Sequence, residues 1–104
     1  MKARLERCKV WDGERNEVYL WCPGCNEYHS VCVDPGGWTW NGNEESPTIN
    51  PSIKVSGYRE KYGPGERTLC HSFVRDGRIQ FLSDSAHSLA GQTVDLPDLD
   101  KEGL

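Results

Sequence analysis

The stretch that decides the fold is Cys22-Pro23-Gly24-Cys25. Two cysteines separated by two residues can bind one tetrahedral Zn²⁺, with Pro and Gly shaping the turn and backbone amides pointing toward the sulfurs. Three further candidate ligands lie elsewhere in the chain, at His29, Cys70 and His71. We therefore expect a metal ion that links the first half of the domain to a hairpin near its end.

The segments on both sides of this turn favour β-strands. Residues 18–21 and 29–33 are rich in β-branched and aromatic side chains, and the second run ends at Asp34-Pro35-Gly36-Gly37. Before them, residues 3–11 and the turn signal Asp12-Gly13 predict a first hairpin. The CPGC turn is thus expected between two strands, as in zinc ribbons.

A second hairpin gives the clearest secondary-structure signal. The β-rich runs 68–75 and 78–82 are separated by Asp76-Gly77, a dipeptide typical of two-residue turns. Such a turn places Cys70 on the same apolar side as Val74 and Phe81, and it points His71 to the opposite side. The third thiolate would then face the core, where it needs a partner.

The remaining segments complete a mainly β prediction. Residues 43–52 contain two prolines and predict an ordered loop, 53–55 a short strand, and 57–66 a glycine-rich loop. Residues 86–90 predict a short helix capped within 83–85, and 93–96 an edge strand. We expect a small, zinc-stabilised antiparallel sheet or barrel with hairpins and one short C-terminal helix. Its domain is expected over 1–97, followed by an acidic tail over 98–104.

Length and composition agree with one small domain. A chain of 104 residues builds a modest core, so a metal cross-link would add stability. No apolar run approaches the roughly 20 residues that cross a bilayer, and five cysteines, an odd number, suit ligands or buried thiols in a reducing compartment. We therefore expect a cytosolic protein without membrane contact. The net charge of −4 disfavours unspecific binding to duplex nucleic acid.

The ligand set predicted from these arguments is Cys22, Cys25, His29 and Cys70. His29 reaches the metal only if the chain curls at residues 26–27, because four extended residues would carry it about 13 Å away. His71 or His87 could take its place, and a local knuckle that uses Cys32 is a further alternative. Cys8 and Cys32 are otherwise expected as small buried thiols.

A catalytic alternative uses the remaining titratable groups. His71 and His87, with Asp84, could act as acid–base groups beside a zinc ion that keeps one position open. A shell of three Cys and one His has no position left for water. Structural zinc is therefore favoured over catalytic zinc, and a binding function over an enzyme.

Several motifs carry a resemblance to a known family of small phage and prophage proteins of unknown function. They are Trp21-Cys-Pro-Gly-Cys25 with His29, Trp38-Thr-Trp-Asn-Gly42, Pro47-Thr-Ile-Asn-Pro51-Ser52, the run from Cys70 to Leu82 and the run from His87 to Pro97. Members of that family are often labelled "ammonia monooxygenase", a reaction of multisubunit membrane copper enzymes that this chain, without a spanning segment, does not fit. The resemblance covers roughly residues 18–99 and implies a phage context.

Three functions follow as expectations. The first is a phage-encoded zinc-binding accessory module in the host cytosol that binds a host or phage protein through exposed aromatic anchors. The second is a zinc-dependent hydrolase that uses His71, His87 and Asp84. The third is binding of a nucleotide or single-stranded nucleic acid by aromatic stacking beside Arg75 and Arg78. The candidate anchors are Trp38, Trp40, Tyr58 and Tyr62.

Overall fold

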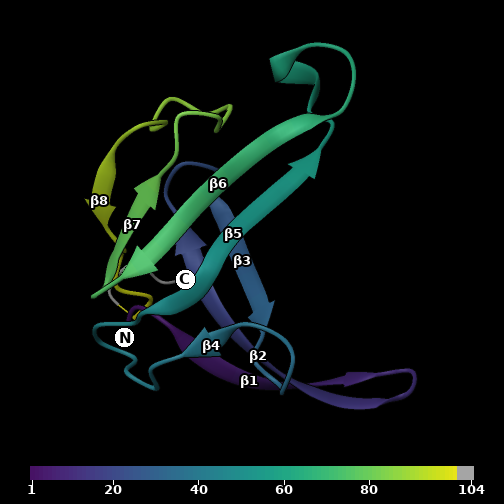
Figure 1. Ribbon diagram of the computed structural model, residues 1–104, viewed down its shortest axis with the longest axis vertical. Coiled ribbons are helices and arrows are strands. Elements are labelled where there is room, and N and C mark those ends of the chain that lie inside the picture. The colour runs from purple at the N-terminus through teal and green to yellow at the C-terminus, as the bar shows by residue number, and fades with distance from the viewer. Residues whose placement is uncertain (101–104) are drawn as a thin grey trace.

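Two antiparallel sheets make up the computed structural model, which describes residues 1–100 (Figure 1). The first sheet has the order β1 (Arg4–Val10), β2 (Gly13–Cys22), β3 (Glu27–Cys32). The second has the order β4 (Thr39–Trp40), β5 (Ile49–Gly57), β6 (Arg67–Arg75), β7 (Arg78–Phe81), β8 (Thr93–Asp95). A short 3₁₀ turn, η1 (Glu60–Tyr62), lies between β5 and β6. The mainly β prediction is therefore confirmed.

The β6–β7 hairpin has the predicted turn and register. Asp76 and Gly77 have φ angles of 50° and 77°, the positive values that a two-residue hairpin turn of type I′ requires. Val74 pairs with Ile79, and Ser72 pairs with Phe81. Because strand side chains alternate, one face of β6 enters the core and the other faces outward.

The core lies between the two sheets. Val18, Leu20 and Val31 contribute from the first sheet, and the second contributes a larger apolar set. Each such side chain stabilises the fold by about 1.5–3 kcal/mol when fully buried. The second sheet's residues in this core are Ile49, Ile53, Cys70, Val74, Ile79 and Phe81.

Strand β5 begins earlier than the sequence predicts. Residues 43–52 were expected as a loop, yet β5 starts at Ile49 and includes Pro51. The proline is tolerated because the ladder to β6 is irregular between Ile49 and Ile53, and because β4 pairs only with Ile49 and Asn50. The segment after Asn50 is therefore a strand with one paired edge.

The predicted helix over residues 86–90 is wrong: within the described chain this segment consists of turns. The backbone N–H of Ala86 donates to the carbonyl of Leu69, and the Ser85 hydroxyl donates to the carbonyl of His71. These bonds to β6 hold the start of the segment beside the strand. The groups that would begin a helical turn are therefore already occupied.

The last described residues pack back onto the start of the chain. Leu96 and Leu99 are buried, and the N–H of Leu99 donates to the carbonyl of Met1 at 2.7 Å. Of the acidic tail expected over 98–104, residues 101–104 lie outside the described residues, and the domain boundary at residue 97 stays a prediction. Among residues 1–100, no helix has the length and apolar composition of a membrane span.

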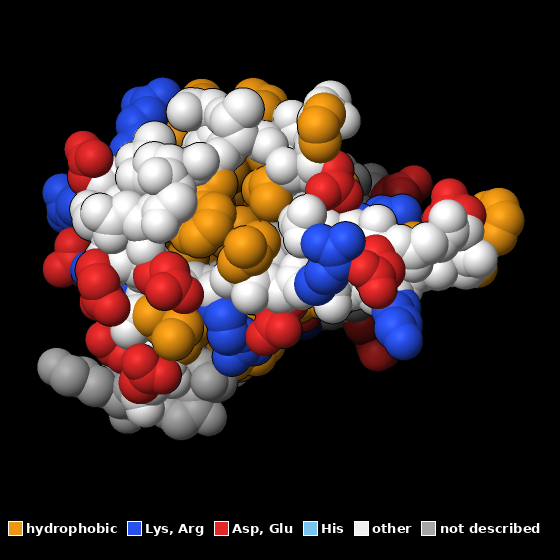
Figure 2. All heavy atoms as spheres, turned by 90° about the horizontal axis from the view of Figure 1, so that it is seen from below, with side chains coloured by type: hydrophobic (Ala, Val, Ile, Leu, Met, Phe, Trp, Pro, Cys, Tyr) orange, Lys and Arg blue, Asp and Glu red, His pale blue; other side chains and the backbone are white. Residues whose placement is uncertain are grey.

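The β1–β2 hairpin projects from the rest of the molecule (Figure 1). Figure 2 shows hydrophobic side chains at the far end of this projection. Trp11, in the turn between the two strands, is 97% exposed. This indole therefore contributes almost nothing to the core.

Candidate active site and metal centre

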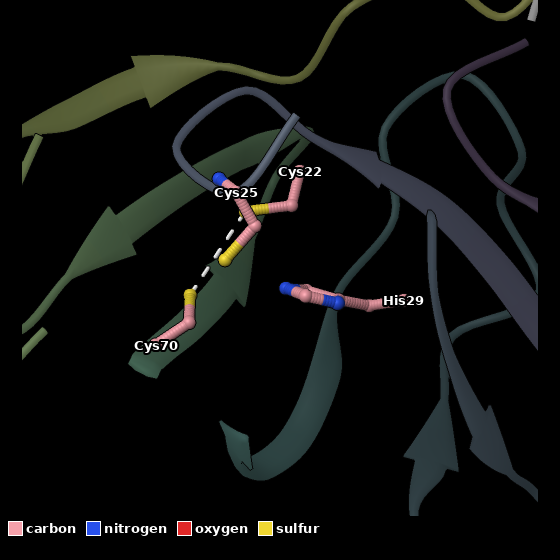
Figure 3. Close-up of side chains that lie close together, drawn as sticks. All are labelled: Cys22, Cys25, His29 and Cys70. Atoms are coloured by element: carbon pink, nitrogen blue, oxygen red, sulfur yellow. Dashed lines mark hydrogen bonds between the residues drawn. The ribbon is translucent and has the colours of Figure 1, made fainter. Parts of the chain in front are cut away.

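Four side chains from both sheets meet at one point (Figure 3). Cys22 ends β2, Cys25 follows in the turn, His29 lies on β3, and Cys70 lies on β6. Their ligand atoms all lie within 4.8 Å of one another. The cluster therefore joins the early turn to the late hairpin, and it could hold a metal ion.

The geometry and chemistry of this cluster fit a tetrahedral metal. The Cys22 and Cys70 sulfurs are 3.9 Å apart, and two sulfurs bound to one tetrahedral zinc ion lie about 3.8 Å apart. The Nε2 atom of His29 is buried and has no hydrogen-bond partner among the described residues. A buried nitrogen without a partner is costly, and a metal bond would remove that cost.

The electrostatics of the cluster also call for a cation. Hydrogen bonds from Cys25 and Cys70 lower the pKa of the Cys22 thiol, while donation to Cys22 and Cys25, together with burial, raises the pKa of Cys70. Burial lowers the pKa of His29, but the neighbouring Cys22 and Cys25 sulfurs outweigh burial and raise that pKa to about 10. One ionised sulfur thus suppresses ionisation of the next. A divalent cation would allow all three thiolates to form.

The local backbone explains how His29 reaches the cluster. Asn26 adopts φ 57°, a left-handed conformation that asparagine tolerates, and its N–H donates to the carbonyl of Cys22 at 2.8 Å. The chain therefore reverses at once, so that β3 pairs Glu27 with Cys22 and His29 with Leu20. The curl that the sequence analysis required at residues 26–27 is present. The N–H of Cys25 also donates to the Cys22 sulfur at 3.3 Å, as expected for a CPGC turn.

His87 lies against the cluster without belonging to it. The N–H of Leu89 donates to His87 Nδ1 at 3.2 Å, so the proton of the neutral ring resides on Nε2, which is 3.4 Å from the Cys70 sulfur. Burial lowers the pKa of His87 and favours this neutral form. The ring also lies on Gly24, where an added Cβ would be 2.2 Å from its Cε1 atom. Gly24 is thus required for close approach of His87.

The other cysteines lie outside the cluster. The Cys8 sulfur is 3.6 Å from the Tyr19 hydroxyl, and the Cys32 thiol donates to Asp34 at 3.6 Å. Both side chains are partly exposed rather than buried. Neither sulfur belongs to the metal-competent group of described residues.

A second constellation lies on the outward side of β6. His71 Nε2 is 3.1 Å from the Ser52 hydroxyl on β5, and His71 Nδ1 is 3.0 Å from Asp84 Oδ2. An ionised carboxylate only accepts hydrogen bonds, so Nδ1 carries the proton and Nε2 is left to accept from Ser52. This order of hydroxyl, imidazole and carboxylate is that of a Ser-His-Asp catalytic triad.

Neighbouring groups hold the triad in place. The backbone N–H of His71 donates to the Ser85 hydroxyl at 3.0 Å, and the N–H of Leu82 donates to the His71 carbonyl at 2.8 Å. The Trp38 indole N–H donates to the Ser52 carbonyl at 3.3 Å. The His71 side chain is 22% exposed, so solvent and a bound substrate can reach the site.

Two members of this triad, His71 and Asp84, are predicted from the sequence as acid–base groups. The third, Ser52, is not predicted, because it lies in a segment expected as a loop. Ser52 ends the motif Pro47-Thr-Ile-Asn-Pro51-Ser52 of the family resemblance, but nothing in that motif marks the serine as a nucleophile. The pairing of β5 with β6 places Lys54 opposite His71. This register brings the Ser52 hydroxyl, two residues earlier on β5, within hydrogen-bond distance of the imidazole.

The aromatic anchor candidates occupy different environments. Trp38 and Trp40 pack against the core, whereas Tyr58 is 55% exposed. Tyr62 lines a small, open pocket beside the metal turn. The other residues lining this pocket are Cys25, Glu27, Arg59, Lys61 and Leu69.

Comparison with known proteins gives one family. The family model BubE, described as bacterial ubiquitination-like system serine protease, matches residues 1–82. The match includes Ser52, His71 and the four residues of the metal-competent cluster, while Asp84 lies just beyond it. Comparisons with curated proteins and with solved structures give no match. Because the family model covers more than half of the sequence, the chain belongs to the BubE family.

Proposed function

We propose that this protein is a serine protease in which Ser52 is the nucleophile, His71 the general base and Asp84 the residue that orients the imidazole. The observation that carries the proposal is the continuous chain of hydrogen bonds from the Ser52 hydroxyl through both His71 nitrogens to Asp84, at 3.1 and 3.0 Å. The description of the family as a serine protease supports it independently.

The proposed reaction is acyl transfer in two steps. Ser52 Oγ attacks the carbonyl carbon of the scissile bond while its proton passes to His71 Nε2. His71 then gives this proton to the leaving amine as the C–N bond breaks, which leaves an acyl group on Ser52. Water attacks that ester by the same route, releasing the acid and restoring the serine. Asp84 accepts a hydrogen bond from the Nδ1–H of His71 throughout and stabilises the imidazolium that forms in each step.

We further propose that the ion held by Cys22, Cys25, His29 and Cys70 is zinc, which sulfur and imidazole ligands favour. When bound, it supplies a structural cross-link between the two sheets. Cys70 and His71 are consecutive on β6, with the thiol inside and the imidazole outside. Fixing the sulfur therefore also fixes the strand that carries the general base.

Part of the zinc-hydrolase alternative predicted from the sequence is retained in the proposed mechanism. His71 and Asp84 retain the acid–base role of the zinc-hydrolase alternative, but a serine hydroxyl replaces metal-bound water as nucleophile. The family description places such proteases in a bacterial ubiquitination-like system, and we propose that setting for this chain. The phage accessory role and nucleic-acid binding stay predictions, because no contact of the described residues favours either over a protease.

The test is hydrolysis of p-nitrophenyl acetate, a small activated ester. Replacement of the nucleophile in Ser52→Ala should lower kcat/KM by at least about a hundredfold. Ser88→Ala is the matched control, because Ser88 is exposed and lies outside the triad, and it should leave the rate unchanged. Equal rates for Ser52→Ala and the wild type would refute the proposed nucleophile.

A further inference from the structure

Strand β5, which carries Ser52, is paired along one edge only beyond Asn50. β6 pairs with it from Ile53 to Gly57, whereas β4 pairs only with Ile49 and Asn50. No described strand lies against the opposite edge beyond that point. In Figure 1 the upper half of β5 forms the outer margin of the β5–β6 hairpin.

The backbone of Lys54 points toward this unpaired edge. Lys54 lies opposite His71, and both backbone groups of His71 are used on the other side, by Ser85 and Leu82. The pair Lys54–His71 is therefore a non-hydrogen-bonded pair of the antiparallel ladder. The N–H and C=O of Lys54 consequently point away from β6. Lys54 is an exposed residue of this edge.

The same edge leads to the nucleophile. Ser52 precedes Lys54 by two residues, so both residues direct their backbone groups to the same side of the strand. The Ser52 carbonyl accepts a hydrogen bond from the indole N–H of Trp38, the residue just before β4. This carbonyl therefore points to the side of β5 on which β4 lies. A chain laid along the edge at Lys54 would therefore lead toward Ser52 and would meet Trp38 there.

We propose that the substrate binds as an extended polypeptide segment that adds a strand to this edge of β5, with the N–H and C=O of Lys54 as its backbone partners. The proposal rests on the proposed protease function, because Ser52 defines where the added strand is cut. Backbone pairing is a general way of recognising extended peptides at sheet edges. It requires an unstructured segment of the substrate and selects weakly for side chains next to the scissile bond.

The test begins with a tryptic digest of a bacterial lysate as the source of peptides. Mass spectrometry identifies a cleaved peptide, which is then synthesised with one backbone N-methyl group at each successive position. In an added strand only every second peptide amide faces β5 and donates to it. N-methylation of these amides should lower kcat/KM about tenfold, whereas N-methylation of the amides that alternate with them should change kcat/KM by no more than about twofold. A profile without this alternation overturns the inference. The absence of any cleaved peptide, while p-nitrophenyl acetate is still hydrolysed through Ser52, overturns it too.

A variant of the strand gives the second test. Lys54→Pro removes the N–H from the unpaired edge, a position where a strand tolerates proline. Peptide cleavage should fall about tenfold, while hydrolysis of p-nitrophenyl acetate, which has no peptide chain, reports an intact triad. Unchanged peptide cleavage by Lys54→Pro overturns the inference. If cleavage is unchanged and the variant also sediments as a monomer where the wild type is a dimer, the edge belongs to a second copy of the chain. Failure of the proposed function is distinct, since ester hydrolysis would then not depend on Ser52.

Discussion

The three residues of the proposed triad come from two adjacent strands and the segment that follows the β6–β7 hairpin. Ser52 and His71 lie on β5 and β6, and Asp84 follows three residues after β7. Side chains on paired strands have little conformational freedom, because the hydrogen-bonded ladder fixes the distance between the two backbones that carry them. Asp84 is about half exposed, at 48%, and binds His71 through one of its carboxylate oxygens at 3.0 Å and the other at 3.3 Å. The hydroxyl–imidazole contact thus depends mainly on the register of β5 and β6.

Replacement of the orienting carboxylate tests the triad directly. In Asp84→Asn the amide no longer fixes the Nδ1 proton or stabilises the imidazolium, so ester hydrolysis should slow by about 10²–10⁴-fold while the melting temperature changes little. Asp95→Asn is the control, because Asp95 pairs with Arg78 on an exposed part of the sheet. A rate for Asp84→Asn equal to that of the control would show that the carboxylate has no catalytic role.

In the metal turn, the lack of a side chain at Gly24 makes room for the His87 ring. Gly24→Ala places a methyl group into the His87 ring and should cost about 1–3 kcal/mol of stability, measured by denaturant unfolding of the metal-loaded protein. In the His87→Ala background the ring is gone, so the same substitution should cost much less. Equal costs in the two backgrounds would contradict the contact between the imidazole and the turn.

At the level of elements, β6 contributes to both sites. Its inward face supplies Cys70 to the cluster, and its outward face supplies His71 to the triad. Any change that releases the sulfur should therefore also disturb the imidazole one residue later.

This coupling predicts a joint loss. Cys70→Ser should lower the bound zinc, measured by atomic absorption, and should reduce ester hydrolysis in the same preparation, because β6 loses its anchor. Cys8→Ser should change neither quantity, since that sulfur contacts only the Tyr19 hydroxyl among the polar groups described. Full zinc content in Cys70→Ser would argue against the assignment of this ligand.

The elements differ in how far the sequence predicts them. The β6–β7 hairpin follows from Asp76-Gly77 and alternating apolar residues, and this local signal also places Cys70 and His71 on opposite faces. Ser52 could not be found in this way, because its position depends on a ladder between residues far apart in the chain. The helix expected at residues 86–90 fails for a related reason: tertiary bonds from Ser85 and Ala86 to β6 override the capping signal.

The whole molecule consists of two sheets whose apolar faces form one core, with the metal-competent cluster between them. Three candidate ligands come from the first sheet and its turn, and Cys70 comes from the second. A bound ion therefore closes a long loop of chain and restrains the sheets relative to each other. Such a cross-link contributes most in a small domain with a modest core.

Removal of the metal should consequently destabilise the entire fold. Treatment with a strong chelator should lower the free energy of unfolding by about 3 kcal/mol or more, which corresponds to a fall in Tm of roughly 10–20 °C. Calorimetry of the chelated and the zinc-reloaded protein measures the difference. A Tm that does not respond to chelation would remove the structural role of the ion.

The role of Ser52 as nucleophile is tested by mapping the adduct left by a fluorophosphonate. The reagent is incubated with the zinc-loaded protein, which is then digested and sequenced by tandem mass spectrometry. We predict one adduct, on the Ser52 hydroxyl, that does not form when His71 is replaced by alanine. An adduct on a different serine, or an unmodified Ser52 after complete reaction, would contradict the account.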